Sequence, residues 1–274
     1  MTEASRAARV DAFRALHVPG SPLMMPNPWD VGAARILSGL GFRALATTSS
    51  GFALTLGRLD YRVTREELLA HCRALCAAVE VPVSADLEDG FGSEPARVAE
   101  TVRLAAETGL AGGSIEDSLR EPGKTLYETQ LAVERVHAAV EAARAVPGGF
   151  VLTARCEAFL YGSSDLDALI RRLQAFEQVG ADVLFAPGLS TLEQVRTVCA
   201  AVKRPVSVLL VPALRRRSFA ELAAAGAARL STGGAPAFFA YASLAAFARG
   251  SAAGGFDHVP TDDDDLAAIK GLLG

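Results

Sequence analysis

The chain has 274 residues, half of them hydrophobic, and a formal net charge of −4 at neutral pH. This is enough for one substantial core, and α/β barrels of about 250 residues commonly form one domain, so we expect residues 1–274 to be a single domain. No basic run is long enough to follow a phosphate backbone, which argues against nucleic-acid binding. A small anionic substrate remains compatible with this composition if local arginines receive it.

The first residues, 1–16, are charged and amphipathic and lack the apolar core and cleavage site of a secretory signal. Apolar runs elsewhere are too short to span a membrane. The cysteines at positions 72, 76, 156 and 199 form neither a disulfide framework nor paired CxxC metal knuckles. We therefore expect a cytoplasmic protein that does not interact with membranes.

Short β-rich runs alternate with amphipathic helical segments, as expected for parallel strands joined by crossover helices. The candidate strands are residues 23–26, 42–48, 82–86, 112–117, 150–155, 182–187, 205–211 and 228–232. The phrases GLGFRAL, TGLAGGSI, VGADVLF and AGAARLS repeat one helix–Gly–strand unit. Eight such units predict a (β/α)8 TIM barrel. A doubly wound open sheet is the alternative, but the chain has no G-x-G-x-x-G fingerprint.

Two further helices are expected outside the barrel units, at residues 3–16 and 262–273, where they could cover barrel ends or mediate association. The acidic tract TDDDD at 261–265 is interpreted as a helix start capped by Thr261, since acidic side chains favour that end of the helix dipole. Metal binding by this tract is the less favoured alternative.

The predicted strand ends are unusually polar, and in barrels of this class the carboxyl ends of the strands form the active-site face. They supply Asn27, Thr48 to Ser50, Asp86, Glu88, Asp89, Glu116, Asp117, Arg155, Glu157, and Thr232 to Gly234.

Three of these carboxylates, Asp86, Glu88 and Glu116, should face one cavity. Their mutual repulsion requires a cation, protonation or an arginine nearby. A hard, all-oxygen site suits Mg²⁺, with Mn²⁺ as a second choice. The alternative is a set of loop carboxylates satisfied by arginine or helix caps.

Arg155 ends an otherwise apolar strand, where a guanidinium can bind a carboxylate or stabilise developing oxyanion charge. A structural pair with Glu116 or Asp86 is its alternative role, and the two can coexist. The segment TTSSG at 47–51 offers hydroxyl and backbone N–H groups that could bind a carboxylate. Ordinary turn formation explains that segment almost as well.

Other catalytic groups are missing from the strand ends. No histidine lies at one, which argues against a His-ligated zinc site. The three lysines, Lys124, Lys203 and Lys270, also lie elsewhere, which argues against an imine-forming aldolase. Cys156 should point towards the helices and serve packing. Metal-stabilised enolate chemistry is the best remaining use of this barrel mouth.

Taken together, the motifs resemble the isocitrate lyase/phosphoenolpyruvate mutase superfamily, in its branch of short, single-domain members. The resemblance covers roughly residues 20–250. It is carried by PNPWDVGAARIL, TTSSGFALTLGRLD, SADLEDGFG, GGSIEDS, TARCEAF, GADVLFAPGL and ARLSTGG.

The resemblance implies a metal site. Asp86 and Glu88 match the acids of the family's D-x-[DE]-x-G-[FY]-G segment, and Glu116 matches the acid of its IED segment. Asp60 matches a further acid that acts through metal-bound water.

The resemblance also implies substrate contacts. Thr48, Ser49 and Ser50 fall where the family surrounds the substrate's carboxylate end, although its usual Ser-Gly is here Thr-Ser. Arg155 matches the substrate-facing arginine. Mg²⁺, a small 2-oxo acid or its enolate, and a mobile loop after the fourth strand are implied as well. So are exchange of a helix near 236–249 between subunits and a homotetramer.

The loop at residues 118–128 departs from the family. Isocitrate and methylisocitrate lyases carry K-[KR]-C-G-H there, whereas this chain reads SLREPGKTLYE, which argues against both activities. The Asn of a phosphoenolpyruvate mutase is also missing. Arg120, Glu121 and Lys124 could close over a substrate and Tyr127 could donate a proton, but we expect these four side chains to be solvated at the surface.

The sequence thus predicts an Mg²⁺-dependent lyase that cleaves a C–C bond of a small 2-oxo or 2-hydroxy di- or tricarboxylic acid, by retro-aldol cleavage or decarboxylation, through a pyruvate-type enolate. Arg155 and Glu116 are the predicted catalytic residues. One alternative is a C–P enzyme, either a phosphonopyruvate hydrolase or a mutase of the phosphoenolpyruvate or carboxyphosphonoenolpyruvate type. Another is a non-catalytic barrel that binds metal or a 2-oxo acid.

Overall fold

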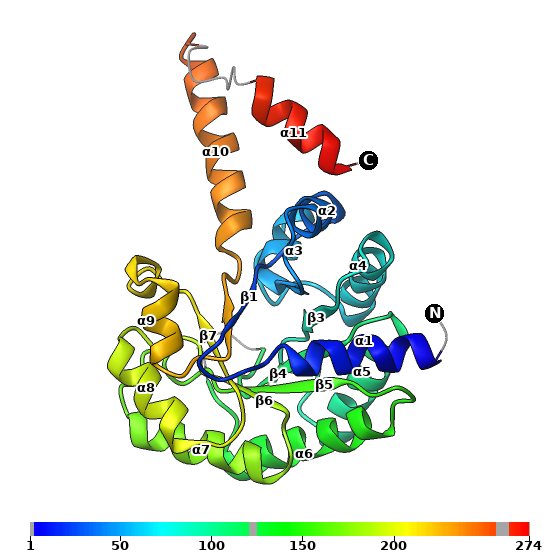
Figure 1. The fold of residues 1–274 in the computed structure, drawn as a ribbon, viewed down its shortest axis with the longest axis vertical. Helices are drawn as coiled ribbons and strands as arrows, with labels where there is room; N and C mark the ends of the chain where they lie inside the picture. Colours follow the sequence, from blue (N-terminus) through cyan, green and yellow to red (C-terminus); the bar gives the residue numbers. More distant parts are fainter. Residues whose placement is uncertain (1–2, 121–124, 256–262, 274) are drawn as a thin grey trace.

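Eight parallel strands form one curved sheet in the computed structural model, which describes residues 3–120, 125–255 and 263–273 (Figure 1). The strands are β1 (Leu23–Met25), β2 (Leu45–Ala46), β3 (Val83–Asp86), β4 (Gly112–Glu116), β5 (Val151–Arg155), β6 (Val183–Phe185), β7 (Val206–Leu209) and β8 (Arg229–Ser231). Their order is β1-β8-β7-β6-β5-β4-β3-β2. A 3.1 Å hydrogen bond from Ala46 N to Pro26 O joins the two edges, so the sheet is a nearly closed barrel. The predicted fold class is confirmed.

Crossover helices surround the strands. They are α2 (Val31–Gly39), α3 (Ser49–Thr55), α4 (Arg65–Ala78), α5 (Pro95–Glu107), α6 (Thr129–Ala145), α7 (Leu166–Gln178), α8 (Leu192–Ala201) and α9 (Phe219–Ala224), with a short 3₁₀ helix, η1 (Leu214–Arg216). Capping boxes begin α4 at Thr64, α8 at Thr191 and α9 at Ser218. In each box the side chain three residues later satisfies a backbone N–H that the helix leaves free. These local signals fix where the helices start.

The inner end of the barrel is closed by α1 (Glu3–Ala15). Its Val10 and Phe13 are buried in a small core with Leu23 and Met25 of β1, distinct from the larger core between the strands and the outer helices. Helix α1 therefore covers the end of the barrel opposite the carboxyl ends of the strands.

The C-terminal helices behave differently from each other. Helix α10 (Ala235–Ala252) projects away from the barrel, whereas α11 (Asp263–Leu273) returns to its side (Figure 1). Leu272 of α11 packs on Gly39 of α2, where an added Cβ would lie 2.6 Å from Leu272 Cδ2. The predicted cap Thr261 lies outside the described residues.

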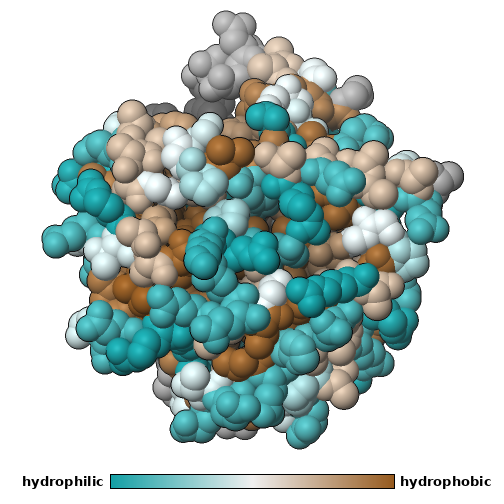
Figure 2. Space-filling model, turned by 60° about the horizontal axis from the view of Figure 1, so that its bottom comes forward, coloured by the Kyte–Doolittle hydropathy of each residue, from teal (hydrophilic) through white to brown (hydrophobic). Residues whose placement is uncertain are grey.

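Hydrophilic side chains cover much of the molecular face shown in Figure 2, with smaller hydrophobic patches between them. Among the helices that the structure describes, none is long and apolar enough to cross a membrane.

Acid should destabilise the protein through His71 on α4. This imidazole stacks on Phe52 at 3.9 Å, and burial lowers its pKa to about 4. Because the unfolded chain binds this proton more readily, the contribution of His71 to stability is complete above about pH 6.5 and is lost as the pH falls towards 4. We expect His71→Phe to reduce the acid slope of the unfolding free energy by about 1.4 kcal/mol per pH unit within that window. Urea unfolding at several pH values tests this, with His137→Phe on the exposed face of α6 as control; equal slopes in wild type and His71→Phe would contradict it.

Candidate active site

A cavity of about 190 Å³ opens at the carboxyl ends of the strands. The predicted site residues that line it are Thr48, Ser49, Ser50, Asp60, Asp86, Glu116 and Arg155. Glu88 does not belong to its lining. The barrel thus brings together seven of the eight predicted side chains from five separate segments of the chain.

Arg155, at the end of β5, is the centre of the charge network. It forms a two-point ion pair with Glu157, in which Nη2 lies 3.0 Å from Oε2. Its Nη1 lies 3.3 Å from Glu116 Oε2 and 3.5 Å from Asp86 Oδ1. Burial alone would lower the pKa of this guanidinium, but the neighbouring carboxylates raise it. The structural pairing considered from the sequence therefore coexists with a position on the cavity wall.

Ser49 connects two of the acids. Its Oγ lies 3.0 Å from both Asp60 Oδ1 and Asp86 Oδ2. A hydroxyl carries one proton, so it can donate to only one of these carboxylates at a time. Burial, and next the charge of Asp86, raise the pKa of Asp60. Arg155 pairs with Asp86, whereas no ion pair among the described residues includes Asp60.

The hydroxyls at 48–50 lie where the chain turns from β2 into α3. Thr48 is the N-cap of α3, and its Oγ1 accepts a hydrogen bond from Gly51 N at 3.3 Å. A Cβ at Gly51 would lie 2.6 Å from Thr48 Cγ2, so the turn requires glycine. The segment therefore forms the turn into α3 and also places its three hydroxyl side chains on the cavity wall.

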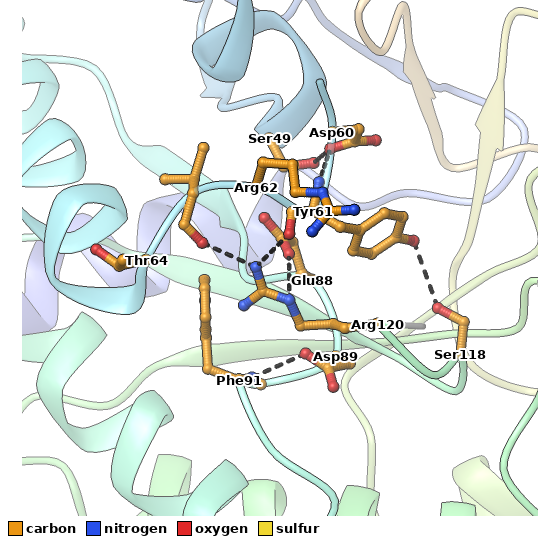
Figure 3. A network of polar contacts seen from close by, with 12 residues as sticks. Ser49, Asp60, Tyr61, Arg62, Thr64, Glu88, Asp89, Phe91, Ser118 and Arg120 are labelled. Atoms are coloured by element: carbon orange, nitrogen blue, oxygen red, sulfur yellow. Dashed lines mark hydrogen bonds and ion pairs between the residues drawn. The ribbon is translucent and has the colours of Figure 1, made fainter. Parts of the chain in front are cut away.

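Glu88 lies behind the cavity, with 1% of its surface exposed. Its backbone has a φ of 50°, and neither carboxylate oxygen accepts a hydrogen bond from a described residue. Its nearest cation is Arg120, whose Nε lies 3.2 Å from Oε2 (Figure 3). Burial raises the pKa of Glu88 to about 9 despite this arginine. An ionised carboxylate that is buried without hydrogen bonds lowers the stability of the fold unless a cation compensates its charge.

The surface roles expected for Arg120 and Tyr127 are wrong. Arg120 is held over Glu88 by hydrogen bonds to Tyr61 O and Val63 O, at 3.0 and 2.8 Å. Tyr127 is buried, and its hydroxyl donates to Asp89 Oδ2 at 3.3 Å. Buried acids draw both side chains inward. The other two loop residues, Glu121 and Lys124, lie outside the described residues.

Tyr61 is a site residue that the sequence did not reveal. Its hydroxyl donates to Glu116 Oε1 and lies 3.2 Å from the hydroxyl of Tyr161. Glu116 Oε1 also accepts from Ser118 Oγ at 2.6 Å. Burial raises the pKa of Glu116 to about 8, although Arg155 opposes this. Tyr61 has a φ of 60°, and a tyrosine next to an acid in an irregular loop carries no pattern that would predict its direction.

Arg229 is a second residue that sequence reasoning missed. It lies on β8 at the inner end of the cavity and is 4% exposed. A signal was available, since a charged residue within an apolar strand is rarely fully buried without a partner.

The carboxylates do not form a ready-made metal site. Among the residues that the structure describes, no three acidic, histidine or cysteine side chains converge as a ligand set. Arg155 and Arg120 supply the positive charge instead, as the alternative interpretation of these acids anticipated. The donor set nevertheless suits a hard cation, because Glu88 has two buried oxygens without hydrogen bonds and its neighbours are carboxylates.

Comparisons with known proteins agree with this geometry. The family model for phosphoenolpyruvate phosphomutase matches residues 13–252. An uncharacterised protein of Mycobacterium tuberculosis (strain H37Rv) is 34% identical over 227 residues, 82% of this chain and 83% of that protein. The 2-methylisocitrate lyase of Escherichia coli (strain K12) is 30% identical over 203 residues, 71% of this chain and 67% of that protein.

Solved structures extend the likeness over nearly the whole chain. A Burkholderia cenocepacia J2315 protein, named provisionally as a lyase/mutase, superposes with a TM-score of 0.89 at 46% identity and covers 96% of both chains. Oxaloacetate acetylhydrolase in complex with oxalate gives a TM-score of 0.86 at 25% identity, covering 98% of this chain and 94% of the other. The chain therefore belongs to the phosphoenolpyruvate phosphomutase family and is an enzyme of the isocitrate lyase/phosphoenolpyruvate mutase superfamily.

Proposed function

We propose that the protein is an Mg²⁺-dependent lyase that cleaves a C–C bond of a small 2-oxo or 2-hydroxy di- or tricarboxylic acid through a pyruvate-type enolate. The observation that carries this is Arg155, a cation held on the cavity wall by Glu157 and faced by Asp86 and Glu116. The likeness to 2-methylisocitrate lyase and to oxaloacetate acetylhydrolase supports C–C cleavage.

The metal site would consist of Asp86, Glu88 and Glu116, with Asp60 acting through water. Mg²⁺ is the first choice and Mn²⁺ the second, since all donors are carboxylate oxygens. When bound, such a cation supplies Lewis acidity and orients the reacting oxygens.

The remaining steps belong to protein groups. The hydroxyls of Thr48, Ser49 and Ser50 orient the carboxylate end of the substrate at the cavity rim. Arg155 stabilises negative charge as it develops on the enolate oxygen, because a preorganised guanidinium needs no rearrangement during the reaction. Tyr61 holds a proton at its hydroxyl, beside Glu116, and is the nearest phenol to the cavity that can protonate the enolate carbon.

The direct test is release of pyruvate from oxaloacetate, substituted malates and phosphonopyruvate, with Mg²⁺ and with a chelator. We expect pyruvate release from oxaloacetate or a substituted malate that requires Mg²⁺ and is abolished by the chelator. Metal-independent turnover, or no turnover of any carboxylic acid, would contradict the proposal.

C–P chemistry is the second candidate, favoured by the match to the phosphoenolpyruvate phosphomutase model over residues 13–252. The same metal and Arg155 would stabilise the pyruvate enolate. Inorganic phosphate or an isomerised phosphonate in the same panel would favour this alternative over C–C cleavage.

Assembly is proposed to involve α10, as expected for a homotetramer that exchanges this helix. On α10, Phe239 is 75% exposed and Leu244 is 59% exposed, and this large apolar surface projects beyond the barrel (Figure 1).

We expect Phe239→Glu to weaken the assembly, because burying an unpaired carboxylate in an apolar interface costs several kcal/mol. Light scattering after size exclusion should show a tetramer for wild type and smaller species for the variant. Phe219→Glu on α9, another exposed phenylalanine, is the matched control and should remain tetrameric. A wild-type monomer would refute the assembly.

A further inference from the structure

The inside of this barrel is polar where such barrels are usually filled with branched hydrophobic side chains. Inward positions of β3, β4, β5 and β7 carry hydroxyls, namely Ser84, Ser114, Thr153 and Ser207, all of them buried. Ser84 and Ser114 line the lower cavity, and Arg229 lies there with them. The cavity therefore continues below the acids into a compartment whose only described charge is positive.

The described partners of the Arg229 guanidinium are all neutral groups. Its Nε donates to Ser207 Oγ at 2.8 Å, and its Nη1 lies 3.3 Å from Thr153 Oγ1 and 3.5 Å from His17 Nε2. No described carboxylate pairs with it, and its Nη2 donates no hydrogen bond to a described residue. Because Arg229 lines the cavity, these unpaired donors of its guanidinium are available to a group bound there.

A buried guanidinium without a carboxylate partner lowers the stability of the folded protein. Burial lowers the pKa of Arg229 to about 10. Burial also lowers the pKa of His17 to about 3, so this imidazole is neutral and does not compensate the charge of Arg229. An apolar side chain of similar size would fill this place at less cost than an uncompensated buried cation. A purely structural role therefore explains Arg229 poorly.

We propose that Arg229 binds a second oxyanionic group of the substrate, a carboxylate or a phosphonate, at the inner end of the cavity. This deepens the proposed function and rests on it, because the first carboxylate would lie at the rim near Arg155. Both cations lie near the ring of Phe185, whose centroid is 5.3 Å from the Arg155 guanidinium carbon and 6.0 Å from that of Arg229, and all three side chains line the same cavity. The two guanidiniums therefore share one small chamber, and a substrate with an anionic group at each end fits this pair of charges.

Binding measured by calorimetry in the presence of Mg²⁺ separates this role from turnover. Malate and 2-hydroxybutyrate form a matched pair of four-carbon 2-hydroxy acids that differ in the distal carboxylate, and 3-phosphonolactate offers a phosphonate instead. In wild type we expect malate and 3-phosphonolactate each to bind at least about tenfold more tightly than 2-hydroxybutyrate, as a charge-assisted pair allows. In Arg229→Met this difference should fall below about twofold, with 2-hydroxybutyrate affinity little changed. Arg229→Lys should retain part of the difference, and Arg204→Met, at an exposed position, should retain all of it.

Thermal unfolding without ligand provides the second readout. Arg229→Met should melt at the same temperature as wild type or higher, because it removes a buried, unpaired charge. A lower melting temperature together with an unchanged preference for dianions would show that Arg229 is structural and would overturn the proposal, as would equal affinities for all three acids in wild type. The preference shows which oxyanion is bound even if no pyruvate is ever released, so this test and that of the proposed function can fail separately.

Discussion

Arg155→Lys is expected to lower kcat/KM for pyruvate release by about 10³-fold, which is the scale of removing a preorganised oxyanion donor. A lysine keeps the charge, but it cannot pair at two points with Glu157 while also facing Glu116 and Asp86. The ammonium would be drawn to one carboxylate, leaving the others uncompensated. Steady-state kinetics with Mg²⁺ measures this loss.

The control for Arg155→Lys is Arg172→Lys. Arg172 supports the same network from outside the cavity, through Asp117, whose Oδ1 accepts a hydrogen bond from Glu157 N at 2.8 Å. It does not line the cavity, so its replacement should cost much less activity. Equal losses in the two variants would mean that Arg155 acts by organising the site and has no direct part in the chemistry.

Tyr61→Phe is expected to lower kcat about 10²-fold while KM changes little, because a positioned proton donor acts in the transition state. The phenylalanine keeps the ring and loses only the hydroxyl that contacts Glu116. Burial raises the pKa of Tyr61, with the charge of Glu116 adding to this effect, so the phenol keeps its proton at neutral pH.

Exchange of the pyruvate methyl protons in D₂O gives an independent measure of the same step. Tyr61→Phe should slow this exchange in parallel with kcat, since exchange requires protonation of the enolate carbon. Tyr161→Phe is the matched control, because the Tyr161 hydroxyl lies 3.2 Å from the Tyr61 hydroxyl and one step further from Glu116. Unchanged exchange in Tyr61→Phe would assign the proton to another group.

The strands and the acids at their ends could be predicted because both depend on local pattern. Alternation of apolar runs and helices located all eight strands, and barrel geometry then placed Asp86, Glu116 and Arg155 together. The second strand is shorter than the predicted 42–48, because Thr48 already caps α3 and the chain turns there.

The loop side chains could not be predicted, because their directions depend on tertiary charges. Arg120 points inward since Glu88 is buried without other compensation, and Tyr61 points inward onto Glu116. Both acids were identified from the sequence, but nothing in the spacing of the loops indicated which distant group would reach them. Arg229 differs from these loop residues, because a charged residue within a strand is itself a signal, whereas its burial and its partners depend on the barrel that surrounds it.

Helix α1, which closes the inner end of the barrel, also constrains how the chain can fold. Arg6 donates hydrogen bonds to Ala106 O, Leu110 O and Gly149 O, the last of them 143 residues along the chain. As the polypeptide is synthesised, this first helix finds none of these acceptors until residue 106 has been made, and the last of them, Gly149 O, lies in the second half of the protein. Contacts of such long range slow folding, because the intervening chain must be ordered before they form. During synthesis the amphipathic face of α1 is therefore exposed to chaperones and to aggregation, well before the barrel that it closes exists.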